Sequence, residues 1–180
     1  MNDVIIMKFD TESKSYQAFS KIKKLHASKQ IVGEQMAVLE HKPNHLLNPK
    51  DFIDFTGGDK NLKGGLIGML IGIIAGPLGI LLGWFAGSMI GASKDVKEVK
   101  GALSIFEETI KTIPEGETGV ILITEEFQTG PIDDIVINEL GGVVVRLDRA
   151  DVEKDIQEAK ETQEEVEEEA QKRWFQKHQR

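Results

Sequence analysis

The sequence contains no cysteine, one tyrosine and two tryptophans among 180 residues. The absence of cysteine excludes disulfides, zinc ribbons, cysteine-ligated iron–sulfur clusters and thiol nucleophiles. The first residues also lack a basic stretch followed by an apolar run, which is the pattern of a cleavable signal peptide. We therefore expect a cytoplasmic origin.

The chain also lacks a net positive charge, because 30 Asp and Glu outnumber 22 Lys and Arg and the net charge is −8. A general nucleic-acid binder needs a basic surface, so we expect no nucleic-acid partner. The acidity is concentrated near the carboxyl end: residues 151–170 carry a net −8, and residues 171–180 carry a net +4. The rest of the chain has an ordinary charge, and its hydrophobic content of 40% is sufficient for an ordered core.

A strand–helix–strand pattern opens the chain. Residues 4–9 are an apolar run rich in β-branched side chains, which predicts a buried strand. Asp10 or Thr11 is then expected to cap a helix with an apolar face. Gly33 is expected to break the chain before a second strand over residues 35–41. The apolar face of this helix is formed by Tyr16, Phe19, Ile22 and Leu25.

A second unit of the same kind lies near the end of the chain. Residues 119–124 predict a strand, residues 131–140 a short helix opened by proline, and residues 143–147 another strand after Gly141-Gly142. Two such units predict an α+β, ferredoxin-like sandwich of four antiparallel strands with two helices on one face. A three-layer α/β domain is the weaker alternative.

The segment between the units is a large insertion. It consists of a loop over 42–63 with an edge strand at residues 52–55, an apolar stretch over 64–93, and an amphipathic helix and loop over 94–117 that Pro114 stops. The predicted organisation is therefore 1–41 and 118–149 for the two halves of the sandwich, the three inserted parts between them, and 150–180 for an acidic helical tail.

The centre of the insertion carries a glycine ladder and no charged residue. A glycine costs about 1 kcal/mol in a helix interior relative to alanine, so a repeated one needs a reason. Spacing of four residues places glycines on one ridge, where a second helix can approach closely. We expect helix packing and self-association through Gly64, Gly68, Gly72, Gly76, Gly79, Gly83, Gly87 and Gly91.

Pro77 separates the two halves of the ladder and predicts a turn, so the stretch reads as a helical hairpin. A single span would put the two halves of the sheet on opposite sides of a membrane. Positive charges flank both ends, which fits both ends being cytoplasmic: Lys60, Lys63, Lys94 and Lys97. Each arm is short for a bilayer span, so burial within a soluble oligomer remains the alternative to membrane insertion.

The order of these features resembles a bacterial family of membrane proteins, domain-of-unknown-function family 1269. The resemblance rests on Val4–Asp10 with its following helix, on the hairpin with its Gly76–Gly79 turn, and on Gly119–Thr124 before a helix ending in Glu139–Val144. It implies a ferredoxin-like domain that carries a hydrophobic hairpin, is associated with membranes and has no assigned activity. It supplies no functional residues.

The tail has a thin heptad-like seam formed by Val152, Ile156, Ala159, Gln163, Val166 and Ala170. We expect a solvated, partly frayed helix. Its end mixes cations with aromatic side chains, namely Arg173, Trp174, Phe175 and Lys177, with Lys172 adjacent. This end either contacts an anionic membrane surface or is a disordered end that packs on a neighbour.

Catalytic and metal-binding patterns are weak. Pro43 interrupts the spacing of His41 and His45, which we expect to be solvated loop residues. Asp133 and Asp134 at a helix start suit the helix dipole better than acid–base chemistry. We therefore predict no catalytic residue, no metal ligand and no cofactor.

Two functions follow from these patterns. The first is a non-enzymatic protein that self-assembles through the hairpin at the cytoplasmic face of the membrane. The second is a soluble, cytoplasmic homo-oligomeric sensor or small-ligand-binding protein with the hairpins buried in the oligomer. No protein partner for the acidic tail can be named.

Overall fold

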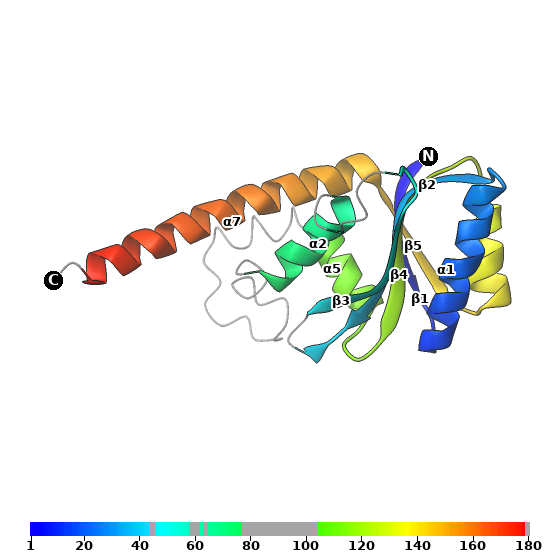
Figure 1. The fold of residues 1–180 in the computed structure, drawn as a ribbon, viewed down its shortest axis with the longest axis horizontal. Coiled ribbons are helices and arrows are strands. Elements are labelled where there is room, and N and C mark those ends of the chain that lie inside the picture. Colours follow the sequence, from blue (N-terminus) through cyan, green and yellow to red (C-terminus); the bar gives the residue numbers. More distant parts are fainter. Residues whose placement is uncertain (44–45, 58–61, 63–64, 77–103, 179–180) are drawn as a thin grey trace.

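The computed structural model describes residues 1–43, 46–57, 62, 65–76 and 104–178. They form a mixed α+β structure around a five-stranded sheet of order β3-β2-β4-β1-β5, in which all neighbouring strands are antiparallel (Figure 1). The strands are β1 (Asn2–Lys8), β2 (Ile31–His41), β3 (Leu47–Asp54), β4 (Thr118–Glu126) and β5 (Val143–Asp148).

One face of the sheet is covered by the helices of the two strand–helix–strand units. These are α1 (Glu12–Ala27) and a short helix, α6 (Gly130–Asp133), which continues as the π-helical segment η3 (Asp134–Glu139) (Figure 1). Thr11 caps α1 by accepting a hydrogen bond from the Lys14 N–H. The side chains of α1 and η3 pack with Ile5, Met7 and Leu122 of the sheet.

The opposite face is covered by α2 (Leu66–Ala75), α5 (Ser104–Thr112) and the long helix α7 (Arg149–His178) (Figure 1). Their apolar side chains, among them Ile67, Phe106 and Ile156, pack with Ile6 and Ile121 in a second core. The molecule therefore has three layers. The sequence predicted helices on one face only, because the helices of the second face lie in the insertion and in the tail.

The strand predictions hold, with corrections at the ends. Gly33, expected to break the chain before the second strand, lies inside β2 next to a register shift between Gly33 and Gln35. A side chain there would collide with the Phe55 ring, 2.7 Å from the site of a Cβ. The predicted edge strand at 52–55 is confirmed in β3, which starts earlier, at Leu47.

Two helices differ from their predicted limits. The helix expected over 94–113 is described as α5 from Ser104 to Thr112, and residues 94–103 lie outside the described part of the chain. On α1, Tyr16 is exposed although its spacing placed it on the apolar face, and Ser15 is buried instead. The Ser15 hydroxyl donates to the Thr118 carbonyl (3.3 Å), so the small polar residue fits beneath the helix.

The acidic tail begins inside the domain. Val152, Ile156 and Ala159 of its predicted seam are buried against the sheet, and the helix continues without a break to His178. The Ile105 N–H donates to the Asp155 carboxylate (3.3 Å), which connects α5 to α7. The first half of α7 is therefore a core element, and only its second half extends past the sheet (Figure 1).

Candidate assembly and membrane surfaces

Helix α2 contains the described part of the glycine ladder and has two different sides. Ile67, Leu70, Ile73 and Ile74 are buried in the core under α7. Residues at positions i, i+3, i+4 and i+7 lie on one side of a helix, which explains why this stripe docks as a unit. The first arm of the predicted hairpin thus packs on the body of the protein.

The glycine ridge lies on the other side of α2. Gly68 is partly buried and Gly72 is exposed. Both lie between buried residues in the sequence but on a different side of the helix. A Cβ built on Gly72 would meet no atom within 4 Å, and Met69 beside it is 36% exposed. In the described part of the chain, Gly72 therefore has no packing partner that requires a glycine.

The amino end of α2 is fitted to β2 by a residue outside the predicted ladder. Gly65 is the N-cap, and a Cβ there would lie 1.8 Å from Gln35 Nε2. Gln35 is buried, and its Oε1 accepts a hydrogen bond from the Ile67 N–H (3.5 Å). The four-residue spacing of the ladder gave no signal for Gly65, because the close contact comes from a strand thirty residues earlier.

The carboxyl end of α2 meets α7. A Cβ on Gly76 would lie 2.9 Å from Gln163 Oε1 and 3.0 Å from the Gly72 carbonyl oxygen. Gly76 therefore serves a contact within the chain, with a seam residue of the tail. The described part of the ladder is therefore divided: Gly76 packs on α7, and Gly72 meets no other described residue closely.

The remaining predicted residues of the hairpin lie outside the described residues. These are Gly64, Gly79, Gly83, Gly87, Gly91, the turn residue Pro77, and the flanking Lys60, Lys63, Lys94 and Lys97. Their roles in the hairpin, the turn and the membrane-surface contact stay predictions.

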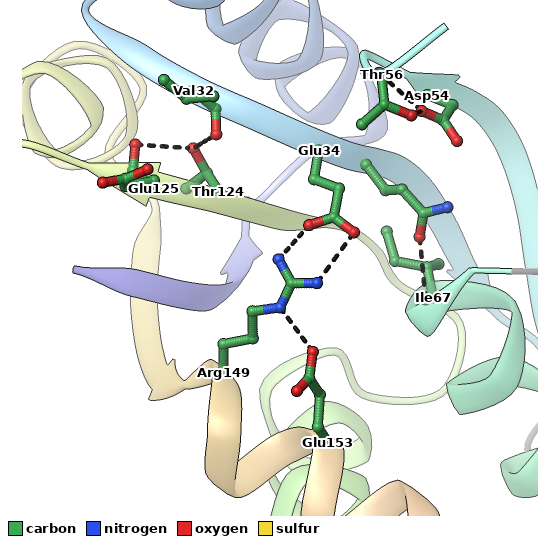
Figure 2. Close-up of polar contacts among 10 residues, drawn as sticks. Val32, Glu34, Asp54, Thr56, Ile67, Thr124, Glu125, Arg149 and Glu153 are labelled. Atoms are coloured by element: carbon green, nitrogen blue, oxygen red, sulfur yellow. Dashed lines mark hydrogen bonds and ion pairs between the residues drawn. The ribbon is translucent and has the colours of Figure 1, made fainter. Parts of the chain in front are cut away.

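An ion-pair cluster fixes the start of α7 to the sheet. Arg149 pairs through both terminal nitrogens with the Glu34 carboxylate of β2, and its Nε donates to Glu153 (2.8 Å) (Figure 2). Hydrogen bonds to Glu34 and then to Glu153 raise the pKa of Arg149 above its ordinary value. Bidentate pairing fixes both direction and position, so this cluster sets where α7 leaves the sheet.

A second cluster lies at the end of β4. The Glu126 side chain is 0% exposed and receives Arg146 Nε at 2.7 Å and Nη2 at 3.0 Å, while Nη1 contacts Asp133 at 2.8 Å. These carboxylates raise the pKa of Arg146, Glu126 most strongly. From its position at a helix start, Asp133 was expected to interact with the helix dipole. The structure adds an ion pair with Arg146, which the spacing of residues did not indicate.

The end of α7 presents the predicted basic-aromatic group on a helix. Trp174 and Phe175 are each 57% exposed, and the Trp174 ring stacks on His178 with centroids 4.5 Å apart. Lys172 and Arg173 approach Glu168 (3.7 Å) and Glu169 (3.8 Å) one turn earlier. Arg173, Trp174, Phe175 and Lys177 are thus together and accessible, at the far end of the helix from the sheet (Figure 1).

His41 is buried, so the expectation that it is a solvated loop residue is wrong. It lies at the end of β2, is buried, and its Nδ1 contacts the Ile113 carbonyl oxygen. His26 accepts a hydrogen bond from the Gly33 N–H (3.0 Å). Among the described residues, no group of three or more His, Asp or Glu side chains is arranged to hold a metal ion.

The described helices and the comparisons with known proteins bear on the membrane and family predictions. No helix in the described ranges combines the length and the apolar character needed to cross a membrane. Comparisons of the chain with family models, with curated proteins and with solved structures give no match. The resemblance to domain-of-unknown-function family 1269 therefore stays a prediction.

Proposed function

We propose that this chain is a non-enzymatic protein that self-assembles through the glycine ridge of α2. The observation that carries the proposal is the division of α2 into a buried stripe and a ridge that, at Gly72, no other described residue covers. A glycine in a helix costs about 1 kcal/mol relative to alanine. No close contact with the described residues offsets this cost at Gly72. Close packing of a second helix on the ridge would offset it.

We also propose that the four strands in the order β2-β4-β1-β5 form a ferredoxin-like core. Their antiparallel pairing and the placement of α1 and η3 on one face support this proposal. The edge strand β3 and the helices α2 and α5 come from the segment between the two units, and they extend the core on its edge and second face.

Membrane association at the cytoplasmic face is the second part of the proposal. It is supported by the absence of charge from 64–93 and by the lysines on both sides of this stretch. The competing function is a soluble homo-oligomeric sensor. One observation favours that alternative: Ile67, Leu70 and Ile73 of α2 are buried against the protein's own sheet.

Fractionation of cells that produce the untagged protein separates the two. The membrane version predicts sedimentation with membranes and release by detergent. Washing with high salt distinguishes surface attachment, which salt releases, from insertion, which salt leaves intact. Recovery entirely in the high-speed supernatant without detergent would contradict the membrane part and leave the sensor as the better account.

A further inference from the structure

The last turn of α1 contacts β2 at the point where the neighbouring edge strand has ended. β3 pairs with β2 only from Gln35 onward, so Gly33 lies beyond the last pair of that ladder, next to the register shift in β2. The Gly33 N–H donates to Nδ1 of His26 on α1, and the two nitrogens are 3.0 Å apart. A side chain of the helix thus supplies an acceptor to a backbone group at the irregular start of β2.

Phe55, the residue after β3, completes this contact. Its N–H donates to the Glu34 carbonyl oxygen (2.9 Å), and its ring lies tilted against the His26 imidazole with centroids 4.4 Å apart. The same ring fills the space in which a side chain at Gly33 would lie. His26, Gly33 and Phe55 therefore hold together the end of α1, the start of β2 and the end of β3.

The direction of the hydrogen bond fixes the protonation state of the His26 ring. A backbone N–H only donates, so Nδ1 must act as the acceptor, and the imidazole must be neutral with its proton on Nε2. A protonated histidine carries a hydrogen on both ring nitrogens and accepts nothing. Histidine side chains ordinarily change charge between pH 5 and pH 8. Acid therefore sets the Gly33 N–H against a second N–H group.

The carboxylates on the two neighbouring segments have other partners. Glu34 of β2 pairs with Arg149 at the start of α7 (Figure 2). Asp54 at the end of β3 accepts hydrogen bonds from the N–H (2.8 Å) and the hydroxyl (2.5 Å) of Thr56. These two carboxylates are therefore held away from the role of counter-ion to a charged imidazole.

The remaining groups around the contact do not favour the neutral ring in the same way. Lys23 of α1 extends over the Phe19 ring, with its Nζ 5.0 Å from the centroid, and Lys29 after the helix is exposed. The Phe55 ring tolerates both charge states of His26, because an aromatic face also attracts cations. The Gly33 N–H is therefore the group that distinguishes the neutral from the charged imidazole.

We propose that His26 is a pH-dependent contact, which holds the start of β2 and Phe55 onto α1 when it is neutral and releases them when it is protonated. Gln35, two residues after Gly33, accepts the Ile67 N–H at the start of α2, so the release acts close to the attachment of that helix. The contact lies within the folded body, and the proposal does not rest on the proposed function.

Amide hydrogen exchange of the full chain, followed by nuclear magnetic resonance from pH 8 to pH 5, tests the proposal. Variants and wild type are compared at the same pH, so the intrinsic pH dependence of exchange cancels. Protection of the Gly33 amide should fall by roughly fivefold as His26 becomes charged, which corresponds to the loss of one ordinary hydrogen bond. Protection of Phe55 should fall with it, whereas Ile121 in the buried centre of β4 should not change.

Two substitutions reproduce the two states of the contact at every pH. His26→Asn offers a side-chain oxygen that can accept the Gly33 N–H and does not titrate, and His26→Leu offers no acceptor. The wild type should match His26→Asn at pH 8 and His26→Leu at pH 5. His178→Asn is the matched control, because His178 lies on the exposed end of α7 and should leave the profile of Gly33 unchanged.

Several results would overturn the proposal. Constant protection of Gly33 from pH 8 to pH 5, or wild-type protection of Gly33 in His26→Leu at pH 8, would show that the imidazole does not hold this amide. An equal loss of protection at Ile121 would mean that acid unfolds the whole sheet. A His26 ring resonance that does not titrate in this range, recorded on the same samples, would exclude it as the pH-dependent group.

Discussion

Gln35 of β2 occupies the space in which a side chain at Gly65 would lie. The distance from Gln35 Nε2 to the site of a Gly65 Cβ is 1.8 Å. The backbone of Gly65 is extended (φ −102°, ψ 173°), a conformation that any residue adopts, so the need for glycine is steric. The contact joins α2, at the start of the glycine-rich stretch, to the strand next to the edge of the sheet.

Gly65→Ala should therefore destabilise the docking of α2. The methyl group must displace a buried amide that accepts the Ile67 N–H, and we expect the free energy of unfolding to fall by about 1–2 kcal/mol. Truncating the partner with Gln35→Ala should relieve the collision, so the double variant should lose less than the sum of the single losses in urea denaturation. Strict additivity would show that the two residues do not compete for this space.

The link between Arg149 and Glu34 gives a second prediction. Arg149→Gln removes the bidentate pair that fixes the start of α7, and we expect a loss of about 1 kcal/mol in urea denaturation. Lys172→Gln is the matched control, because its pair with Glu168 is 72% exposed on both sides. Equal effects of the two substitutions would contradict an anchoring role for Arg149.

Breaking the buried pair of Glu126 and Arg146 should lower the free energy of unfolding more than breaking the pair of Arg149 and Glu34. Arg146→Met leaves the fully buried Glu126 carboxylate without its cation, which typically costs about 3–5 kcal/mol. Adding Glu126→Leu removes the isolated charge and should recover a large part of the loss. A midpoint of unfolding for the double variant that is no higher than that of Arg146→Met would show that the penalty does not come from the unpaired carboxylate.

Glu40 and Lys50 make stability depend on pH at both extremes. The Lys50 ammonium, 3.2 Å away, lowers the pKa of Glu40 below its ordinary 4.5, and Glu40 in turn raises the pKa of Lys50 above 10.5. The carboxylate contribution is present above pH 4.5 and is lost as the pH falls through the lowered pKa. The ammonium contribution is present below pH 10.5 and is lost as the pH rises through the raised pKa.

Lys50→Gln should flatten both limbs of a plot of melting temperature against pH. Lys111→Gln is the control, because its contact with Glu108 is 4.0 Å long and Lys111 is 79% exposed. An acid limb that is unchanged in Lys50→Gln would mean that Glu40 does not contribute through this pair.

The strands were predictable because their residues are continuously apolar. Val4–Met7 and Val120–Ile123 are buried on both faces of the sheet, so their composition alone identifies them. The same burial implies cover on both faces, yet the favoured ferredoxin-like prediction had helices on one face, and only the weaker three-layer alternative had them on both. Helix α7 of the second face hides three core residues, Val152, Ile156 and Ala159, within an acidic sequence typical of a solvated tail.

The surfaces were predictable only where a local repeat exists. The four-residue spacing located Gly68, Gly72 and Gly76, but it could not distinguish the open Gly72 from Gly76, which Gln163 covers from a distant helix. Gly65 and the pairs of Arg149 and Arg146 depend on partners far away in the chain. Contacts between residues that are distant in the chain produce no local sequence pattern from which they could be predicted.

The mass of the Gly72→Leu variant in a mild detergent tests the central claim most directly. Gly130→Leu is the matched control, because Gly130 of α6 is also exposed and a Cβ there also meets no atom within 4 Å. Light scattering should show that Gly72→Leu forms a smaller or heterogeneous species while Gly130→Leu keeps the wild-type mass, since a leucine on the ridge holds the helices apart. An unchanged oligomer in Gly72→Leu would contradict assembly through the glycine ridge.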